Sequence, residues 1–151
     1  MKSTTRLMRA GSLAVLGVII LEAVVSLIAR WPYQFNGPGS PDSVWQDFIS
    51  NGTALAPPLV LIVVLALITW GVHRSGTIQI VAGILLAVLA LVMIVGAAGE
   101  LLAPASADVP RAVQLIGGAL NAALAIGLFV VTLRWLVARR RARVVARAEL
   151  P

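Results

Sequence analysis

The sequence predicts an all-α integral membrane protein: an antiparallel four-transmembrane-helix bundle with a short amphipathic interfacial helix in its first outer loop. Three observations lead to this prediction. Of the 151 residues, 60% are hydrophobic and 12% are charged, too few polar groups to cover a soluble domain. Four apolar stretches are close to or above the roughly 20 residues that a helix needs to cross a bilayer. The basic residues lie at the ends of these stretches rather than inside them.

The four expected spans belong to a single membrane domain, residues 1–151. Backbone groups in lipid must be satisfied within their own segment, and strand-like alternation is absent, so each stretch is expected to be helical. Pro57 and Pro58 fall in the first turn of the second span, where a missing N–H costs little. The expected segments are a first span at about 10–29, an outer loop at 30–53, a second span at about 54–72, a third at about 77–103, a fourth at about 112–137 and a basic tail at 138–151.

The positions of Lys and Arg predict that both termini are cytoplasmic. With the N-terminus inside, only Arg30 and Arg111 of the 12 basic residues fall on the outer side. The composition, rich in Ala, Val, Leu and Arg, is typical of a GC-rich bacterial genome, so we expect a multi-pass protein of the plasma (inner) membrane. The alternative is that the first span is a cleaved signal peptide. Glu22 within the span and the lack of a small-residue cleavage site after it argue against cleavage.

The outer loop 30–53 is expected to form a short helix on the membrane surface, anchored by aromatic side chains. Ser40-Pro41-Asp42 matches a helix start, with Ser as N-cap and Pro at the first helical position. Aromatic residues of this loop would then cover the outer end of the bundle as a lid. These lid candidates are Trp31, Tyr33, Trp45 and Phe48.

Glu22 is expected about 10 Å inside the outer end of the first span, at 1.5 Å per residue. An ionised carboxylate costs about 2.5 kcal/mol or more at membrane depth, so Glu22 should face the bundle and either pair or stay protonated. Ser26, Glu100 and Asn121 are expected in the same half. The four residues are candidates for a ligand-binding or proton-coupling pocket, and ordinary hydrogen bonds between helices are the other interpretation. Either Arg30 or Arg111 could neutralise Glu100, and a salt bridge from Arg111 is the geometrically easy one.

Small residues recur along the fourth span at spacings that allow another helix to approach closely. Gly118 and Ala122 form one such pair, and Ala119, Ala123 and Gly127 form a second row. These faces can serve packing within the bundle or contact with another chain. The sequence favours internal packing, because four helices must pack somewhere.

The basic tail is expected to bind anionic lipids of the inner leaflet through Arg139, Arg140, Arg141 and Arg143. This use and the setting of topology explain the positive charge, so no nucleic-acid partner is expected. The chain contains no Cys and a single His, which excludes thiolate and multi-histidine metal centres. No cofactor is expected.

The sequence contains no nucleophile, phosphate-binding or metalloprotease motif, so we do not expect an enzyme. The leading hypothesis is a non-enzymatic accessory subunit or scaffold that packs against a membrane partner, or a homo-oligomer. The alternative is a binder or transporter of a small amphiphile or cation, acting through an outer-half polar pocket centred on Glu22.

Overall fold

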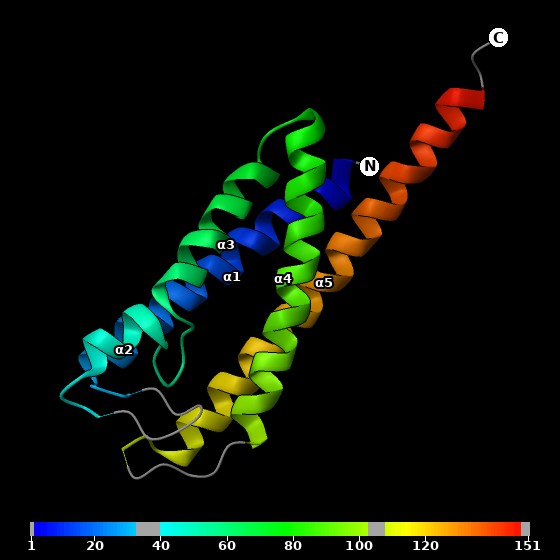
Figure 1. The fold of residues 1–151 in the computed structure, drawn as a ribbon. Helices are drawn as coiled ribbons and strands as arrows, with labels where there is room; N and C mark the ends of the chain where they lie inside the picture. The colour runs from blue at the N-terminus through cyan, green and yellow to red at the C-terminus, as the bar shows by residue number, and fades with distance from the viewer. Residues whose placement is uncertain (1, 33–39, 103–107, 149–151) are drawn as a thin grey trace.

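The computed structural model describes residues 2–32, 40–102 and 108–148, and every regular element in that part of the chain is a helix (Figure 1). Three of the helices, α1, α4 and α5, are long and apolar enough to cross a membrane, and α3 is a shorter apolar helix. This agrees with the prediction of a helical membrane protein. The helices are α1 (Lys2–Ile28), α2 (Val44–Ser50), α3 (Leu59–Val72), α4 (Gly76–Leu102) and α5 (Arg111–Ala148).

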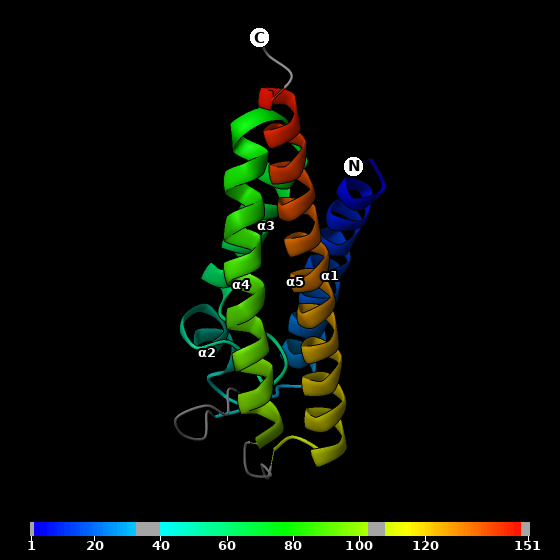
Figure 2. The ribbon, with the colours of Figure 1, turned by 90° about the vertical axis from the view of Figure 1, so that its right-hand side faces the viewer.

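The four longer helices pack in a ring, in which α3 contacts α1 and α4, and α5 contacts α4 and α1. Helices α4 and α5 run side by side in both ribbon views (Figures 1 and 2). One end of the bundle carries the tight turn between α3 and α4 and the beginning of α1, and is called the turn end. The other carries α2 and the connection to α5, and is called the loop end.

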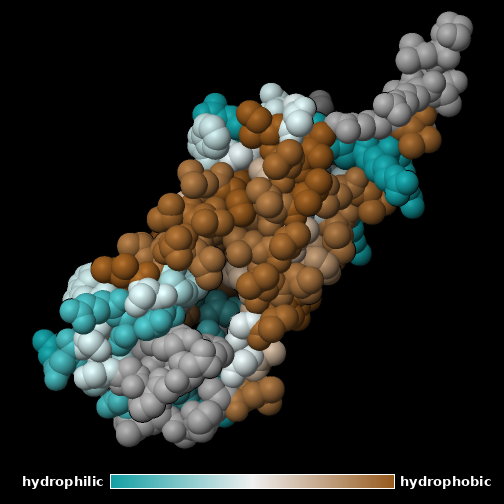
Figure 3. Space-filling model, in the orientation of Figure 1, coloured by the Kyte–Doolittle hydropathy of each residue, from teal (hydrophilic) through white to brown (hydrophobic). Residues whose placement is uncertain are grey.

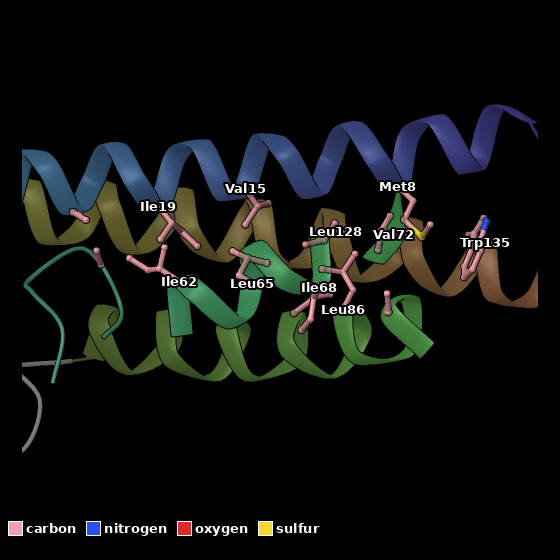
Figure 4. Close-up of a cluster of buried hydrophobic side chains, with 14 residues drawn as sticks. Met8, Val15, Ile19, Ile62, Leu65, Ile68, Val72, Leu86, Leu128 and Trp135 are labelled. Atoms are coloured by element: carbon pink, nitrogen blue, oxygen red, sulfur yellow. The ribbon is translucent and has the colours of Figure 1, made fainter. Parts of the chain in front are cut away.

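A continuous cluster of buried apolar side chains runs along the inside of this ring (Figure 4). Helix α1 presents Met8, Val15 and Ile19 at intervals of seven and four residues, which places them on one face of the helix. Helices α3, α4 and α5 meet this face with Leu65, Leu86, Leu128, Trp135 and their neighbours. Most of the remaining apolar side chains are exposed, as expected when lipid is the solvent.

The helix boundaries depart from the predicted segments in three places. Helix α1 begins at Lys2, eight residues before the expected span, and α5 carries the basic tail to Ala148 as continuous helix. Helix α3 begins at Leu59 rather than near 54, because Pro58 is extended (ψ 147°) and the residues before it form a turn.

Helix α2 is shorter than the predicted surface helix. It begins at Val44, and the expected N-cap, Ser40, instead accepts a hydrogen bond at Oγ from the Asp42 N–H (3.3 Å) within the preceding turn. Val44 is buried and Phe48 packs against the core cluster, whereas Ile49 is exposed. The helix therefore rests on the loop end of the bundle by one edge only.

Candidate functional site

The connection from α2 to α3 is a buried turn, residues 52–56. The Thr53 N–H donates to the Ala56 carbonyl (2.8 Å), and the Ala56 N–H donates to Thr53 Oγ1 (3.1 Å). Gly52 has φ +98°, and a Cβ there would lie 2.6 Å from the Ala56 carbonyl oxygen, so the turn needs glycine at this position. Leu55 is buried, and a Cβ on Gly117 of α5 would lie 2.6 Å from Leu55 Cδ2. The turn is thus held between helices rather than in solvent.

A cavity of about 380 Å³ lies beside this turn, between α3 and the loop-end half of α4. Its volume is in the range of about 300–1,000 Å³ that is usual for small-molecule sites. In the space-filling view a hollow with hydrophilic atoms at its floor lies where the apolar surface of the bundle meets the more hydrophilic loop end (Figure 3). The walls are mainly apolar: Leu61, Ile62 and Leu65 from α3, and Leu89, Val92, Met93, Gly96 and Ala97 from α4.

The cavity opens sideways between exposed apolar faces of α3 and α4. Leu61 and Val92, which line it, are 37% and 53% exposed. Gly96 also lines it, and a Cβ at Gly96 would meet no atom within 4 Å. Exposed apolar side chains of both helices therefore flank the opening of the cavity.

Polar groups are concentrated at one end of the cavity. Glu100 of α4 and Asn121 of α5 line it, together with Ser50, Asn51 and Thr53 from the α2–α3 connection. Asn121 Nδ2 donates to the carbonyl of Leu55 (3.4 Å), which ties α5 to the buried turn. The cavity thus has an apolar body and a polar end.

Glu22 lies just behind this polar end. It is 8% exposed, its side chain hydrogen-bonds that of Asn121, and its carboxyl is close enough to that of Glu100 for their charges to interact. The structure therefore brings Glu22, Glu100 and Asn121 together, with Glu100 and Asn121 lining the cavity. Ser26 is fully buried and is not among the lining residues.

Three buried oxygens at this end have no hydrogen-bond partner within residues 2–32, 40–102 and 108–148: Glu22 Oε2, Glu100 Oε2 and Ser26 Oγ.

The expected salt bridge between Arg111 and Glu100 is wrong. Arg111 instead donates from Nη2 to the Leu101 carbonyl (3.3 Å) and from Nη1 to Gln114 Oε1 (3.2 Å). A carbonyl at the end of α4 attracts the guanidinium, since the last carbonyls of a helix lack intrahelical partners.

The aromatic lid candidates lie apart from the cavity, so far as the structure describes them. Trp31, Trp45 and Phe48 are not among the lining residues, and Trp45 is 65% exposed. Tyr33 lies outside the described residues. Within the outer loop 30–53, the described residues that line the cavity are Ser50, Asn51 and Thr53, none of which is aromatic.

The turn end is closed by two arginines. Arg9 of α1 donates from Nε to the Val72 carbonyl (3.2 Å) and from Nη2 to the carbonyls of His73 and Arg74 (3.3 and 3.2 Å). These carbonyls end α3, so an arginine from another helix completes the C-terminus of α3.

Arg139 of α5 contacts the first turn of α4. Its guanidinium donates to Gln79 Oε1 (2.6 Å) and to the Gly76 carbonyl (3.3 Å), and lies 5.2 Å from the centre of the Trp135 ring. Trp135 in turn donates from Nε1 to Thr5 Oγ1 (3.1 Å). All four long helices are therefore linked at this end.

The other arginines proposed for lipid binding differ from Arg139. Arg140 and Arg141 are exposed. They belong to α5, whose C-terminal part extends beyond the other helices in Figure 1. The side chain of Arg143 lies outside the part that the structure describes.

Within the described ranges, no group of three His, Cys, Asp or Glu side chains could hold a metal ion. No family model, no curated protein and no solved structure matches this chain. What the site can do therefore has to be inferred from its own geometry. That geometry is an apolar cavity with two carboxyls and an amide at its polar end.

Proposed function

We propose that the chain is a multi-pass protein of a bacterial plasma membrane, with four crossing helices, both termini in the cytoplasm and the loop end outside. The basic residues support this orientation, because only Arg30 and Arg111 lie toward the loop end. The 14 residues of α3 span about 21 Å at 1.5 Å per residue, less than the roughly 30 Å of hydrocarbon. The buried turn 52–56 would complete this crossing. Non-helical backbone is tolerated at membrane depth where it is buried in protein or lines a cavity.

Within this membrane, we propose that the protein is a non-enzymatic binder of a small amphiphile. The observation that carries the proposal is the cavity between α3 and α4, which is apolar along its walls, open toward the lipid side and polar at one end. An apolar tail would lie between Leu61 and Met93, and the polar head would lie at Glu100 and Asn121. A soluble polar ligand would gain little from such walls.

Two glycines with matched surroundings provide the test. A Cβ at Gly96 or at Gly17 meets no atom within 4 Å, both residues are exposed on long helices, and only Gly96 lines the cavity. Native mass spectrometry from lipid nanodiscs would measure the ligand kept after the annular lipid is stripped. We expect one retained amphiphile on the wild type and on Gly17→Leu, and none on Gly96→Leu. Equal retention by the two variants, or none by the wild type, would reject the proposal.

The second candidate is an accessory subunit or homo-oligomer. Ala119, Ala123 and Gly127 recur at every fourth residue of α5 and are all exposed, whereas Gly118 packs against Leu101. An exposed row of this spacing lets a helix of another chain approach closely. Gly127→Leu should then shift the protein to a smaller assembly in cross-linking of native membranes, with Gly17→Leu as the control. An unchanged cross-linking pattern would count against this candidate.

The extension of α5 is proposed to contact anionic lipids through Arg140 and Arg141, each contributing about 1 kcal/mol near the surface. Arg139 already has partners within the bundle, so its contribution to lipid binding should be smaller.

A further inference from the structure

At the polar end of the cavity, buried carboxyl oxygens lack a hydrogen-bond donor within the described residues. Glu22 Oε2 and Glu100 Oε2 are buried and lack partners within the described residues. Asn121 donates to the Leu55 carbonyl and shares a hydrogen bond with Glu22. The side-chain amide of Asn121 therefore has little hydrogen-bonding capacity left for Glu100. A buried acceptor without a donor is costly, and a buried carboxyl more so than a hydroxyl.

No basic side chain of the described part of the chain pairs with these carboxyls. Arg111, the arginine closest to Glu100 in sequence, is held by the Leu101 carbonyl and by Gln114. Arg30 follows the end of α1 by two residues and is exposed. Arg9 and Arg139 are engaged at the opposite end of the bundle. Glu100 therefore lines the cavity and Glu22 lies behind its polar end, and within the described residues neither carboxyl is paired with a cation.

We infer that the amphiphile bound in the α3–α4 cavity has a primary ammonium head, which lies against Glu100 and Asn121 with its apolar tail between α3 and α4. This inference rests on the proposed amphiphile binding and specifies its ligand class. An ammonium group offers three donors and a positive charge to a site that holds unpaired acceptors of negative character. A sulfate or phosphate head would place like charges together, and a trimethylammonium head has the charge but no N–H to donate.

The shape of the cavity agrees with this ligand class. The polar residues lie at one end, next to the buried turn, and Leu65, Leu89 and Met93 lie along the walls away from it. A head at Glu100 thus directs a single chain along the groove between the two helices. Glu22, behind Asn121, adds negative charge to the head site without lining the cavity.

The test uses photoactivatable amphiphiles that share one diazirine-bearing alkyl chain and differ only in the head: primary ammonium, trimethylammonium, hydroxyl or sulfate. Each is added to the full-length protein in nanodiscs, and the labelled fraction of peptides containing Met93 is measured. We expect the primary ammonium probe to label at concentrations at least about tenfold lower than the hydroxyl probe, the difference expected for one charge-assisted hydrogen bond. The sulfate probe should label least.

Glu100→Gln should remove this preference, so that the ammonium and hydroxyl probes label alike. Asp42→Asn is the matched control, since it makes the same charge change at an exposed acid of the loop end. Should Glu100→Gln fail to fold, the ratio between heads on the wild type still decides the inference.

Equal labelling by the ammonium and hydroxyl probes on the wild type, blocked by Gly96→Leu, would overturn the ammonium head and leave the amphiphile site intact. Two results would overturn both the ammonium head and the amphiphile site. One is that none of the four probes labels the α4 wall, and the other is that Gly96→Leu does not reduce the labelling. A preference for ammonium that survives Glu100→Gln in a folded protein would also overturn the role given to that carboxyl.

Discussion

At the turn end of the bundle, Arg9 and Arg139 reach between helices and have partners, whereas at the loop end two buried carboxyl oxygens have no partner within the described residues. Arg9 and Arg139 satisfy the last carbonyls of α3 and the first turn of α4. Glu22 and Glu100 meet beside a cavity without a neutralising side chain in the described residues. Ionisable side chains therefore lie at helix contacts at both ends of the bundle. Within the described residues, those at the turn end have hydrogen-bond partners, whereas carboxyl oxygens at the loop end lack them.

This difference indicates a division of roles. At the turn end, side chains of α1, α4 and α5 and backbone carbonyls at the end of α3 link the helices, and Trp135 fills the space above Gly83. The hydroxyls of Thr69 and Thr132 in this half also lack partners in the described residues, but an uncharged hydroxyl costs less than a carboxyl. The loop end leaves room and unsatisfied acceptors, which costs stability and is expected where a ligand supplies the missing contacts.

The largest expected difference between the two ends is their side of the membrane. The chain has no Cys, so single-cysteine variants report one position each. Asp42→Cys at the loop end should react with a membrane-impermeant maleimide on intact cells, and Ser75→Cys at the turn end only after permeabilisation. Both residues are exposed, so their accessibility within the protein is comparable. If Ser75→Cys reacted on intact cells and Asp42→Cys only after permeabilisation, the topology would be the reverse of the proposed one. If both reacted equally on intact cells, the two ends would not lie on opposite sides of the membrane.

Next in size is the cost of filling a glycine site. A Cβ on Gly83 would lie 2.5 Å from Trp135 Cζ3, and Trp135 is 2% exposed and has little room to move. Gly83→Ala should lower the free energy of unfolding by about 2 kcal/mol, the range seen for overpacking. Gly96→Ala, in the open cavity, should raise it by up to about 1 kcal/mol, because alanine favours helix.

Reversible unfolding in mixed micelles measures both glycine variants. Equal effects of the two alanines would mean that the turn end is no better packed than the loop end.

Arg139→Ala should lower the free energy of unfolding by about 1.5 kcal/mol, since hydrogen bonds to a charged group are lost at Gln79 and Gly76. Arg140→Ala, one residue later and exposed, should be nearly neutral. The same unfolding experiment applies. A similar loss for both arginines would show that the charge of the tail matters rather than the contacts of Arg139.

The smallest effect is expected for the unpaired carboxyls. Glu22→Gln and Glu100→Gln should each change the free energy of unfolding by no more than about 0.5 kcal/mol, or raise it, because the replaced oxygens have no described partner. Glutamine keeps the shape of the side chain and a donor or acceptor for Asn121. A loss above about 2 kcal/mol in either variant would mean that the carboxyl is a structural element and not a ligand contact.

The long helices were predictable because their length and hydropathy reflect the thickness of a bilayer, which acts on each segment alone. The depth of Glu22, Glu100 and Asn121 followed from counting residues, and the structure brings them together. The start of α3 was not predictable from Pro57 and Pro58, since two prolines are compatible with a first helical turn as well as with an extended entry.

The cavity walls were not predictable, because a void depends on how two helices diverge rather than on any residue type. Met93 and Gly96 have nothing in their sequence neighbourhood to distinguish them from other apolar positions of α4. The turn 52–56 depends on Leu55 reaching Gly117 and Asn121, two contacts more than 60 residues apart in the chain. Arg111 was assigned to Glu100 by proximity in sequence, but the free carbonyl of Leu101 was the competing acceptor.

Two methionines allow the comparison between the ends to be measured in the unaltered chain. Met8 is fully buried in the core near the turn end, and Met93 lines the cavity. With methyl-¹³C methionine in deuterated nanodiscs, addition of protonated dodecylamine should shift the Met93 methyl resonance and give intermolecular NOEs to it, while the Met8 resonance stays in place. Gly96→Leu should abolish the Met93 response. Equal shifts at Met8 and Met93, or no NOE to Met93 at saturating dodecylamine, would contradict the account.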